Sequence, residues 1–256
     1  MIRPFRSLLG LGLALMAFAA PAAAQTLRIG TEAAYKPFAY VLPSGELTGF
    51  DIDITKALCK QMGVECTITN MAFDGLIPAL NAKKVDAIIA SMSITEEREK
   101  TIGMAGPYYF VPAMFIGAKD AGLEATPEAL SGKYVGVQRG STMSNYVKAT
   151  FPDARVQAYD TVEAAVLDLG SGRVDLVFAD SVVLSDFLAG KDGAGFAPVG
   201  DPVYNKEYLG SGAGIGVRLD DAELKAKFND ALAALIASGE YKTLNDKYVP
   251  IDILPK

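Results

Sequence analysis

Short apolar runs along the chain alternate with longer segments in which apolar residues recur every three or four positions. The short runs predict strands at 27–30, 64–70, 85–90, 134–138 and 174–179. The longer segments predict helices at 51–62, 74–82, 142–149, 161–170, 223–238 and 241–248. Gly63 is placed to end the first of these helices, and Asp51 or Asp53 favours its start. Strands that alternate with helices predict an α/β fold with mostly parallel sheets.

One unit of this pattern occurs twice. Residues 80–91 (LNAKKVDAIIAS) and 169–180 (LGSGRVDLVFAD) each contain a helix end, a basic turn, Val-Asp, an apolar strand and a final polar residue. The repetition predicts two lobes built on the same plan. Because ligands of α/β proteins lie beyond the carboxyl ends of strands, we expect Ser91 and Asp180 to occupy equivalent positions facing a shared cleft.

The first 24 residues have the parts of a secretory signal peptide. A basic start with Arg3 and Arg6 precedes an apolar run at 8–20, and Ala22-Ala23-Ala24 supplies a small-residue cleavage pattern. The apolar run is shorter than the roughly 20 residues that span a bilayer. We expect cleavage after Ala24 and release of a soluble protein into the periplasm or an equivalent extracellular space.

Export changes the interpretation of the two cysteines. Cys59 and Cys66 are seven positions apart, and an oxidising compartment favours a disulfide between them over two buried free thiols. The bridge would join a helix end to the following strand and stabilise the fold by roughly 2–3 kcal/mol in the loop-entropy account. The spacing is not that of a Cys-x-x-Cys redox motif.

Composition excludes several kinds of function. The 256 residues include 24 Lys and Arg against 30 Asp and Glu, a formal net charge of −6. Without Arg3 and Arg6 the mature chain has 22 positive and 30 negative charges, a net of −8. An acidic chain with no basic run argues against nucleic acid or an anionic membrane as partner. The sequence has no histidine and too few cysteines for a zinc site, so we expect no imidazole chemistry, no metal and no cofactor.

Four motifs follow one another along the chain: GTEAAYKPF at 30–38, GFDID at 49–53, SMSITEER at 91–98 and VGVQRGST at 135–142. Together with the signal peptide they resemble the periplasmic solute-binding proteins of family 3, which serve ABC importers of polar amino acids. The similarity is greatest to the lysine/arginine/ornithine- and histidine-binding proteins. It covers essentially the whole mature chain, including the Cys59–Cys66 pair.

The resemblance implies a type II periplasmic binding protein fold, which is α/β with two lobes and two hinge strands. By analogy, lobe 1 comprises residues 26–111 and 205–256, and lobe 2 comprises 112–204. The hinges are expected at 108–112 and 202–206.

Several residues could hold the backbone of an amino acid. Arg98 lies in a charged run that could simply face solvent, but its guanidinium could also grip a carboxylate, as the matching arginine of the family does. Ser91 and Ser93 could be loop hydroxyls or could bind the backbone of the amino acid. Ser141 and Thr142 lie at the start of a helix, where we expect a cap together with a carboxylate site at the helix amides.

Asp180 ends an apolar strand, where an unpaired buried charge would be costly. It could cap the next helix, but the resemblance implies that it binds the ligand's α-ammonium group. Tyr35 and Phe73 could be core aromatics; the family places aromatic residues here on both sides of the ligand's side chain. Asp74 is expected to cap the helix after Phe73. Glu32 could be an exposed acid, and the resemblance implies that it meets a distal cation on the ligand.

The side-chain pocket departs from that of the named relatives. Ala90 stands where they have serine, Glu32 is longer than their aspartate, Gln138 replaces an apolar residue and Met143 replaces a polar one. Arginine, lysine, ornithine, histidine and larger arginine-derived opines therefore remain open as ligands.

The expected function is capture of an amino acid with a cationic side chain, by closure of the lobes, and its delivery to the membrane permease of an ABC importer. The chain is expected to be a monomer that catalyses no reaction. A periplasmic lyase similar to the cyclohexadienyl dehydratases, with Glu32 as general acid, is the alternative from another class. A receptor ectodomain is disfavoured because no later apolar segment could cross a membrane.

Overall fold

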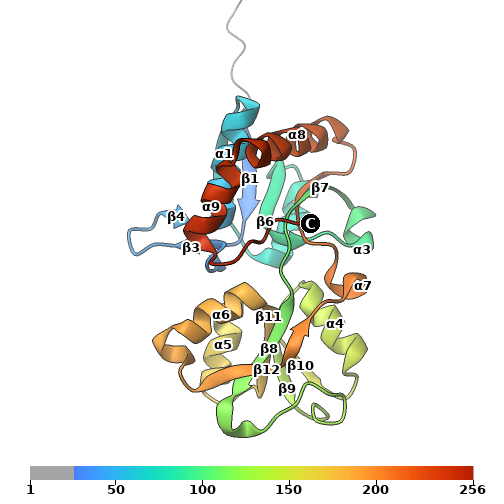
Figure 1. The fold of residues 1–256 in the computed structure, drawn as a ribbon. Helices are drawn as coiled ribbons and strands as arrows, with labels where there is room; N and C mark the ends of the chain where they lie inside the picture. The colour runs from blue at the N-terminus through green and yellow to red at the C-terminus, as the bar shows by residue number, and fades with distance from the viewer. Residues whose placement is uncertain (1–25, 256) are drawn as a thin grey trace, which may run out of the picture.

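The computed structural model describes residues 26–255, so the predicted signal peptide lies outside the described residues. Two bodies lie one above the other in Figure 1, and each is built around a five-stranded sheet. The upper body, which we call lobe 1, is coloured blue to cyan and again red, so both ends of the described chain contribute to it (Figure 1). The lower body, lobe 2, is coloured green to orange and comes from the middle of the chain.

Lobe 1 has the strand order β5-β1-β6-β13-β7. Its strands are β1 (Thr26–Thr31), β5 (Glu65–Asn70), β6 (Ala87–Ser93), β7 (Ile102–Tyr109) and β13 (Ala213–Arg218). Its helices are α1 (Phe50–Met62), α2 (Leu76–Asn81), α3 (Glu96–Glu99), α8 (Ala222–Ser238) and α9 (Glu240–Tyr248). Alternate residues of β6 enter two cores, since Ala87 and Ile89 pack with α1 and α8 whereas Ile88 and Ala90 pack with α2. The sheet is therefore covered on both faces, as an apolar strand requires.

Lobe 2 has the strand order β10-β9-β11-β8-β12. Its strands are β8 (Ala113–Ala118), β9 (Tyr134–Gln138), β10 (Arg155–Tyr159), β11 (Leu176–Asp180) and β12 (Phe196–Val203). Its helices are α4 (Thr142–Thr150), α5 (Val162–Gly170) and α6 (Ser181–Ala189). The remaining elements are a small sheet of β2 (Ala34–Tyr35), β3 (Ala39–Val41) and β4 (Leu47–Thr48), the short 3₁₀ helices η1 (Phe73–Gly75), η2 (Lys119–Ala121) and η3 (Lys191–Gly193), and α7 (Lys206–Leu209).

Both large sheets are mixed, so the expectation of mostly parallel sheets was wrong for half of their strand pairs. In lobe 1, β1 pairs in parallel with β5 and β6, but β13 is antiparallel to β6 and β7. Lobe 2 repeats this plan, with β9 parallel to β10 and β11, and β8 antiparallel to β11 and β12. The antiparallel strands adjoin the segments through which the chain passes from one sheet to the other. These strands do not belong to the strand–helix–strand units that produce parallel pairing.

The chain passes between the sheets twice. The first passage is 110–112, between β7 and β8, and the second follows β12 and leads through α7 to β13. Helix α7 packs against α4, so it lies where the lobes meet. Glycine allows the residues that lead into β13 to lie close to the end of β7, because a Cβ at Gly212 would lie 2.6 Å from the carbonyl oxygen of Tyr109. The glycine-rich run at 210–214 therefore leads into β13 in close contact with the end of β7.

The internal repeat is reproduced in the backbone. The turn before β6 has a positive φ of 57° at Lys83, and the turn before β11 has 70° at the equivalent Gly172. The next amide in each copy, that of Lys84 or Arg173, donates to a carbonyl five residues earlier. Two segments with this shared hydrogen-bond pattern confirm that the strands ending near Ser91 and Asp180 are built alike.

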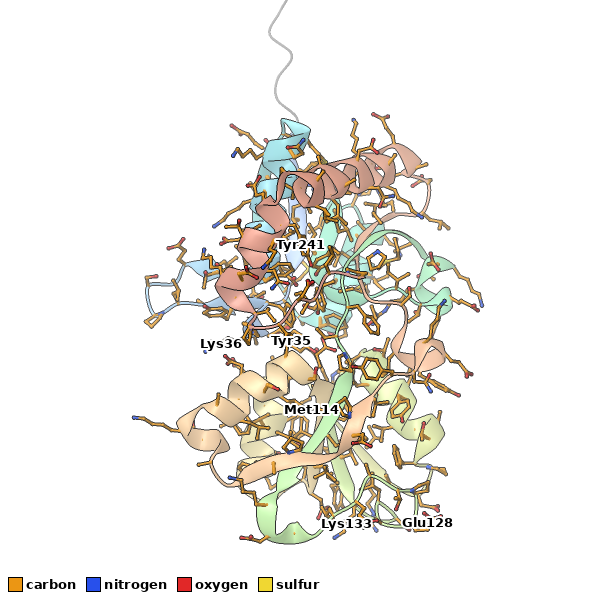
Figure 2. The ribbon with its side chains drawn as sticks, viewed as in Figure 1. Tyr35, Lys36, Met114, Glu128, Lys133 and Tyr241 are labelled. Carbon is orange, nitrogen blue, oxygen red and sulfur yellow. A yellow bond between two sulfur atoms is a disulfide. The ribbon has the colours of Figure 1, made fainter. Side chains whose placement is uncertain are left out.

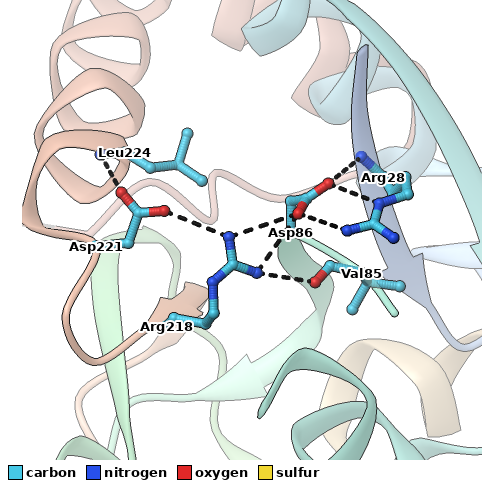
Figure 3. A network of polar contacts seen from close by, with 6 residues as sticks. All are labelled: Arg28, Val85, Asp86, Arg218, Asp221 and Leu224. Carbon is cyan, nitrogen blue, oxygen red and sulfur yellow. Dashed lines mark hydrogen bonds and ion pairs between the residues drawn. The ribbon is translucent and has the colours of Figure 1, made fainter. Parts of the chain in front are cut away.

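The aspartates of the two Val-Asp pairs have the same structural role. Asp86 accepts a hydrogen bond from the amide of Arg28 at 3.1 Å, and Asp175 accepts one from the amide of Tyr134 at 2.8 Å. Figure 3 shows that Asp86 also lies between the guanidinium groups of Arg28 and Arg218, at 2.8 and 3.4 Å. These carboxylates join neighbouring strands at the end of the sheet away from the cleft.

The first helix ends as the sequence predicts, with Gly63 in the left-handed conformation. Cys59 and Cys66 form the predicted disulfide, which joins α1 to β5. Among residues 26–255, no helix combines the length and the apolarity that crossing a membrane would require.

Candidate functional site

The residues singled out from the sequence converge on one small cavity between the lobes. Its walls are Glu32, Tyr35, Phe73, Ala90, Ser91, Ser93, Arg98, Gln138, Ser141, Thr142, Met143 and Asp180. The cavity measures about 20 Å³, room for about one water molecule. A free amino acid can therefore enter only if the lobes move apart.

The two ends of the sequence repeat face this cavity from opposite lobes. Ser91 lies on β6 and Asp180 is the last residue of β11, and both strands are the third in their sheets. Asp180 also stands at the position preceding α6, but its side chain makes no capping hydrogen bond. The capping interpretation of Asp180 is therefore wrong, and its carboxylate is directed elsewhere.

The Asp180 carboxylate is buried and its hydrogen-bond partners are neutral. The Tyr109 hydroxyl donates to its Oδ2 at 3.3 Å, across the boundary between the lobes. Burial raises the pKa of Asp180 to about 7, although hydrogen bonds from Tyr35 and Tyr109 oppose the shift. A carboxylate in this state is stabilised by any cation that enters the cavity.

Arg98 supplies a cation at the same cavity. It lies on the single-turn helix α3, which Thr95 caps by accepting from the Arg98 amide. Its guanidinium donates to the carbonyl oxygen of Ser93 at 2.8 Å and, across the lobes, to that of Gly140 at 3.1 Å. Burial lowers the pKa of Arg98 to about 10. The solvated-face interpretation of Arg98 does not hold, since its guanidinium lies between two lobes and also over the ring of Phe73.

The start of α4 faces Arg98 from lobe 2. Ser141 caps this helix by accepting from the amide of Ser144 at 3.4 Å, as predicted. The hydroxyls of Thr142 and Ser93 lie 3.5 Å apart across the cleft. Helix amides, two hydroxyls and a guanidinium thus converge where a carboxylate would be well bound.

Glu32 marks the other end of the cavity. It is 5% exposed and accepts a hydrogen bond from the amide of Ala34 at 3.1 Å. Burial raises its pKa to about 7, partly opposed by the amide of Gln138. Gln138 belongs to lobe 2 and also donates to the carbonyl oxygen of Asp160 at 3.2 Å. The distal end therefore pairs a buried acid from lobe 1 with an amide from lobe 2.

Tyr35 and Phe73 form aromatic walls, and each is 8% exposed. Figure 2 shows Tyr35 at the lower edge of lobe 1, where it faces lobe 2. The expected cap at Asp74 was wrong, because this residue lies inside η1 and α2 begins without a side-chain cap. The Asp74 carboxylate instead lies 3.7 Å from Arg139 of lobe 2, as an ion pair between the lobes.

Sequence reasoning missed the groups behind the cavity walls. Tyr108 and Tyr109 end β7 next to the first passage between the lobes, and Tyr109 contacts Asp180. Asp51 was interpreted as a favourable charge at the start of a helix, but it is 1% exposed and bonds to Ser91 and Tyr108. A tyrosine pair at the start of a predicted hinge was the available signal, since adjacent strand residues point to opposite sides.

Comparisons with known proteins identify the family of the chain. A model of the family described as bacterial extracellular solute-binding proteins, family 3, matches residues 27–251. The L-arginine-binding protein of Pseudomonas aeruginosa is 45% identical over 251 residues, 96% of this chain and 97% of the relative. The lysine/arginine/ornithine-binding periplasmic protein of Escherichia coli is 41% identical over 249 residues, 96% and 95% of the two chains.

A solved structure extends the similarity to the fold. An ancestral arginine-binding protein bound to arginine has a TM-score of 0.82 and 38% identity, over 88% of this chain and 98% of that chain. These matches confirm both the family and the relatives predicted from the four sequence motifs. The chain belongs to family 3 of the bacterial extracellular solute-binding proteins.

Proposed function

We propose that this protein binds an amino acid with a cationic side chain and delivers it to the permease of an ABC importer. The charges around the cavity carry the proposal. Arg98 provides one positive charge, and Asp180 and Glu32 provide two separate acids whose hydrogen-bond partners are neutral. Arginine, lysine and ornithine carry the complementary set, one carboxylate and two cations, whereas glutamate would bring a second carboxylate to Glu32.

Each residue has a role in this arrangement. Arg98, Thr142 and the first amides of α4 bind the α-carboxylate, and Asp180 binds the α-ammonium group. Glu32 binds the distal ammonium or guanidinium group. Tyr35 and Phe73 pack against the aliphatic stem between the two ends. Ala90, Ser91, Ser93, Gln138, Ser141 and Met143 complete the wall.

The lobes act as two half-sites. We place lobe 1 at 26–111 and 205–256 and lobe 2 at 112–204, with hinges at 108–112 and 202–206. A ligand that touches both halves favours the closed form by its differential affinity, and the closed form presents the surface that the permease recognises. The mature protein works as a periplasmic monomer after removal of residues 1–24 and catalyses no reaction.

The relatives support the cationic class. Their names specify L-arginine in one case and lysine, arginine or ornithine in the other, and histidine-binding periplasmic proteins also match this chain. The charge argument supports histidine as a ligand less strongly, because its side chain is mostly neutral at pH 7.

The test is a thermal-shift screen of the mature chain with the common amino acids, followed by calorimetry. Arginine, lysine and ornithine should raise the melting temperature, because a ligand that binds the folded state stabilises it. Glutamate and aspartate should not. Stabilisation by acidic amino acids, or by no amino acid, would refute the proposal.

A matched pair of variants tests the role of Glu32. Glu32→Gln should weaken arginine binding about 10- to 100-fold, because the distal cation loses its carboxylate. Glu163→Gln makes the same chemical change at an exposed acid near Glu32 and should leave the affinity within about twofold. Equal effects of the two changes would show that Glu32 acts at long range and does not contact the ligand.

A further inference from the structure

The backbone of Ser91 has an unusual conformation. Its φ is 53°, and Lys83 is the other non-glycine residue with a positive φ within residues 26–255. A residue with a side chain adopts this left-handed conformation at a cost in free energy, so its surroundings must hold it there. Ser91 lines the cavity, and therefore whatever holds its peptide also shapes the site.

Two buried side chains of lobe 1 hold Ser91 from behind. The amide of Ser91 donates to the Tyr108 hydroxyl at 3.0 Å, and that hydroxyl donates to Oδ1 of Asp51 at 2.9 Å. The Ser91 hydroxyl donates to Oδ2 of Asp51 at 2.9 Å, which closes the ring of hydrogen bonds. Asp51 is 1% exposed and Tyr108 is fully buried.

The directions of these bonds fix what each group contributes. Both carboxylate oxygens of Asp51 accept, so an asparagine would turn its amide hydrogens toward one of the two donors. The amide and the hydroxyl of Ser91 both take part in the ring of hydrogen bonds. Its carbonyl oxygen is the one polar group of Ser91 that lies outside this ring. Asp51 and Tyr108 lie behind the cavity-lining residues, so they affect a ligand through Ser91.

We propose that Asp51 and Tyr108 are positioning residues that hold Ser91 in the left-handed conformation and thereby direct its peptide toward the ammonium end of the ligand. This inference rests on the proposed function, since it assigns a task to Ser91 in amino acid binding. It adds two residues that contribute to affinity without contacting the ligand.

Tyr108→Phe and Tyr241→Phe form a matched pair for the test. Both remove the hydroxyl of a buried tyrosine. Tyr241 belongs to α9 and is labelled in Figure 2. Its hydroxyl donates to the carbonyl oxygen of Tyr108 at 2.6 Å and makes no hydrogen bond to Asp51. We expect Tyr108→Phe to weaken L-arginine binding about 10-fold by calorimetry and Tyr241→Phe to leave it within about 2-fold. Similar melting temperatures of the two variants would show that general destabilisation is not the cause.

Ser91→Gly tests the mechanism, because glycine adopts a positive φ without help. In the Ser91→Gly background, Tyr108→Phe should weaken binding by less than about 3-fold. An unchanged affinity of Tyr108→Phe, or an equal loss in both backgrounds or in Tyr241→Phe, would overturn the proposal.

Amide hydrogen exchange gives a readout that needs no ligand. Tyr108→Phe should accelerate exchange of the Ser91 amide at least about 10-fold, whereas Tyr241→Phe should not. If the wild-type protein does not bind arginine, lysine or ornithine, the proposed function is wrong. The exchange of the Ser91 amide then still decides whether Tyr108 holds it, and an unchanged rate would reject that role.

Discussion

Binding of a cationic amino acid should release protons, because the site holds two carboxyl groups that are not fully ionised at neutral pH. Burial raises the pKa of Glu32 and of Asp180 to about 7. Each group is therefore about half protonated at pH 7, and each must ionise fully when it pairs with a cation of the ligand. Binding of arginine at pH 7 should release about one proton in all.

The same shifts predict how affinity depends on pH. The ligand binds the ionised carboxylates, so protons compete with it, and affinity falls as the pH decreases through about 7. Between pH 8 and pH 6 the ionised fraction of each group falls about 10-fold, so the affinity for arginine should fall about 100-fold. The guanidinium of arginine stays protonated over this range and does not contribute.

Calorimetry can count the protons directly. Titrations with L-arginine at pH 7 in phosphate, Hepes and Tris give enthalpies whose slope against the buffer ionisation enthalpy is the number of protons released. Glu32→Gln removes one of the two groups and should reduce the slope to about half. Glu163→Gln removes only a minor cause of the raised pKa of Glu32 and should lower the slope much less. A zero slope with a flat affinity from pH 6 to 8 would refute the reasoning, because both acids would then be ionised before the ligand arrives.

Three further changes test the fold and the contact between the lobes. Replacing both Cys59 and Cys66 with serine should lower the free energy of unfolding by about 2.5 kcal/mol without changing arginine affinity, as measured by denaturant unfolding and calorimetry. Lys36→Ala removes an ion pair with Asp186 of lobe 2, in which the charged atoms lie 3.2 Å apart and both side chains are well exposed. The affinity for arginine should therefore fall less than about 5-fold, and this loss should vanish in 1 M salt. Gly212→Ala should cost more than about 2 kcal/mol of stability, because φ is 116° and the new Cβ would meet the carbonyl oxygen of Tyr109; an unchanged melting temperature would contradict this.

The sequence predicts the fold best where local signals agree with each other. The helices at 223–238 and 161–170 combine apolar periodicity with clear end residues, and both are found within one residue of the predicted bounds. The strand β13 was not predicted, because its glycine-rich sequence is selected by close contact with neighbouring strands and has weak strand propensity. The passages between the lobes depend on pairing between residues far apart in the chain, which local pattern does not encode.

The candidate site could likewise be predicted from the sequence only in part. Ser91 and Asp180 were predictable from the repeat, because ligands of α/β proteins lie beyond the carboxyl ends of strands. Other cavity-lining residues, such as Glu32, Tyr35 and Phe73, were predicted from the resemblance to the family. Asp51 was not, since a carboxylate in the first turn of a helix already has an ordinary explanation in the helix dipole. Its partners Ser91 and Tyr108 lie 40 and 57 positions further along the chain, so their convergence is a property of tertiary structure.

The repeat explains why the two lobes present different charges to the ligand. Two lobes built alike would give two like-charged walls if both equivalent positions carried an acid, but lobe 1 has neutral Ser91 at this position of β6 and adds Arg98 from α3. Each charged group then reaches the opposite lobe through a neutral partner, Arg98 through the carbonyl of Gly140 and Asp180 through the hydroxyl of Tyr109. A zwitterion replaces both neutral partners with charged ones, and charge-assisted hydrogen bonds are roughly twice as strong as neutral ones. The gain therefore requires both ends of the ligand at once, which is why an analogue lacking the ammonium group should bind one lobe without favouring closure.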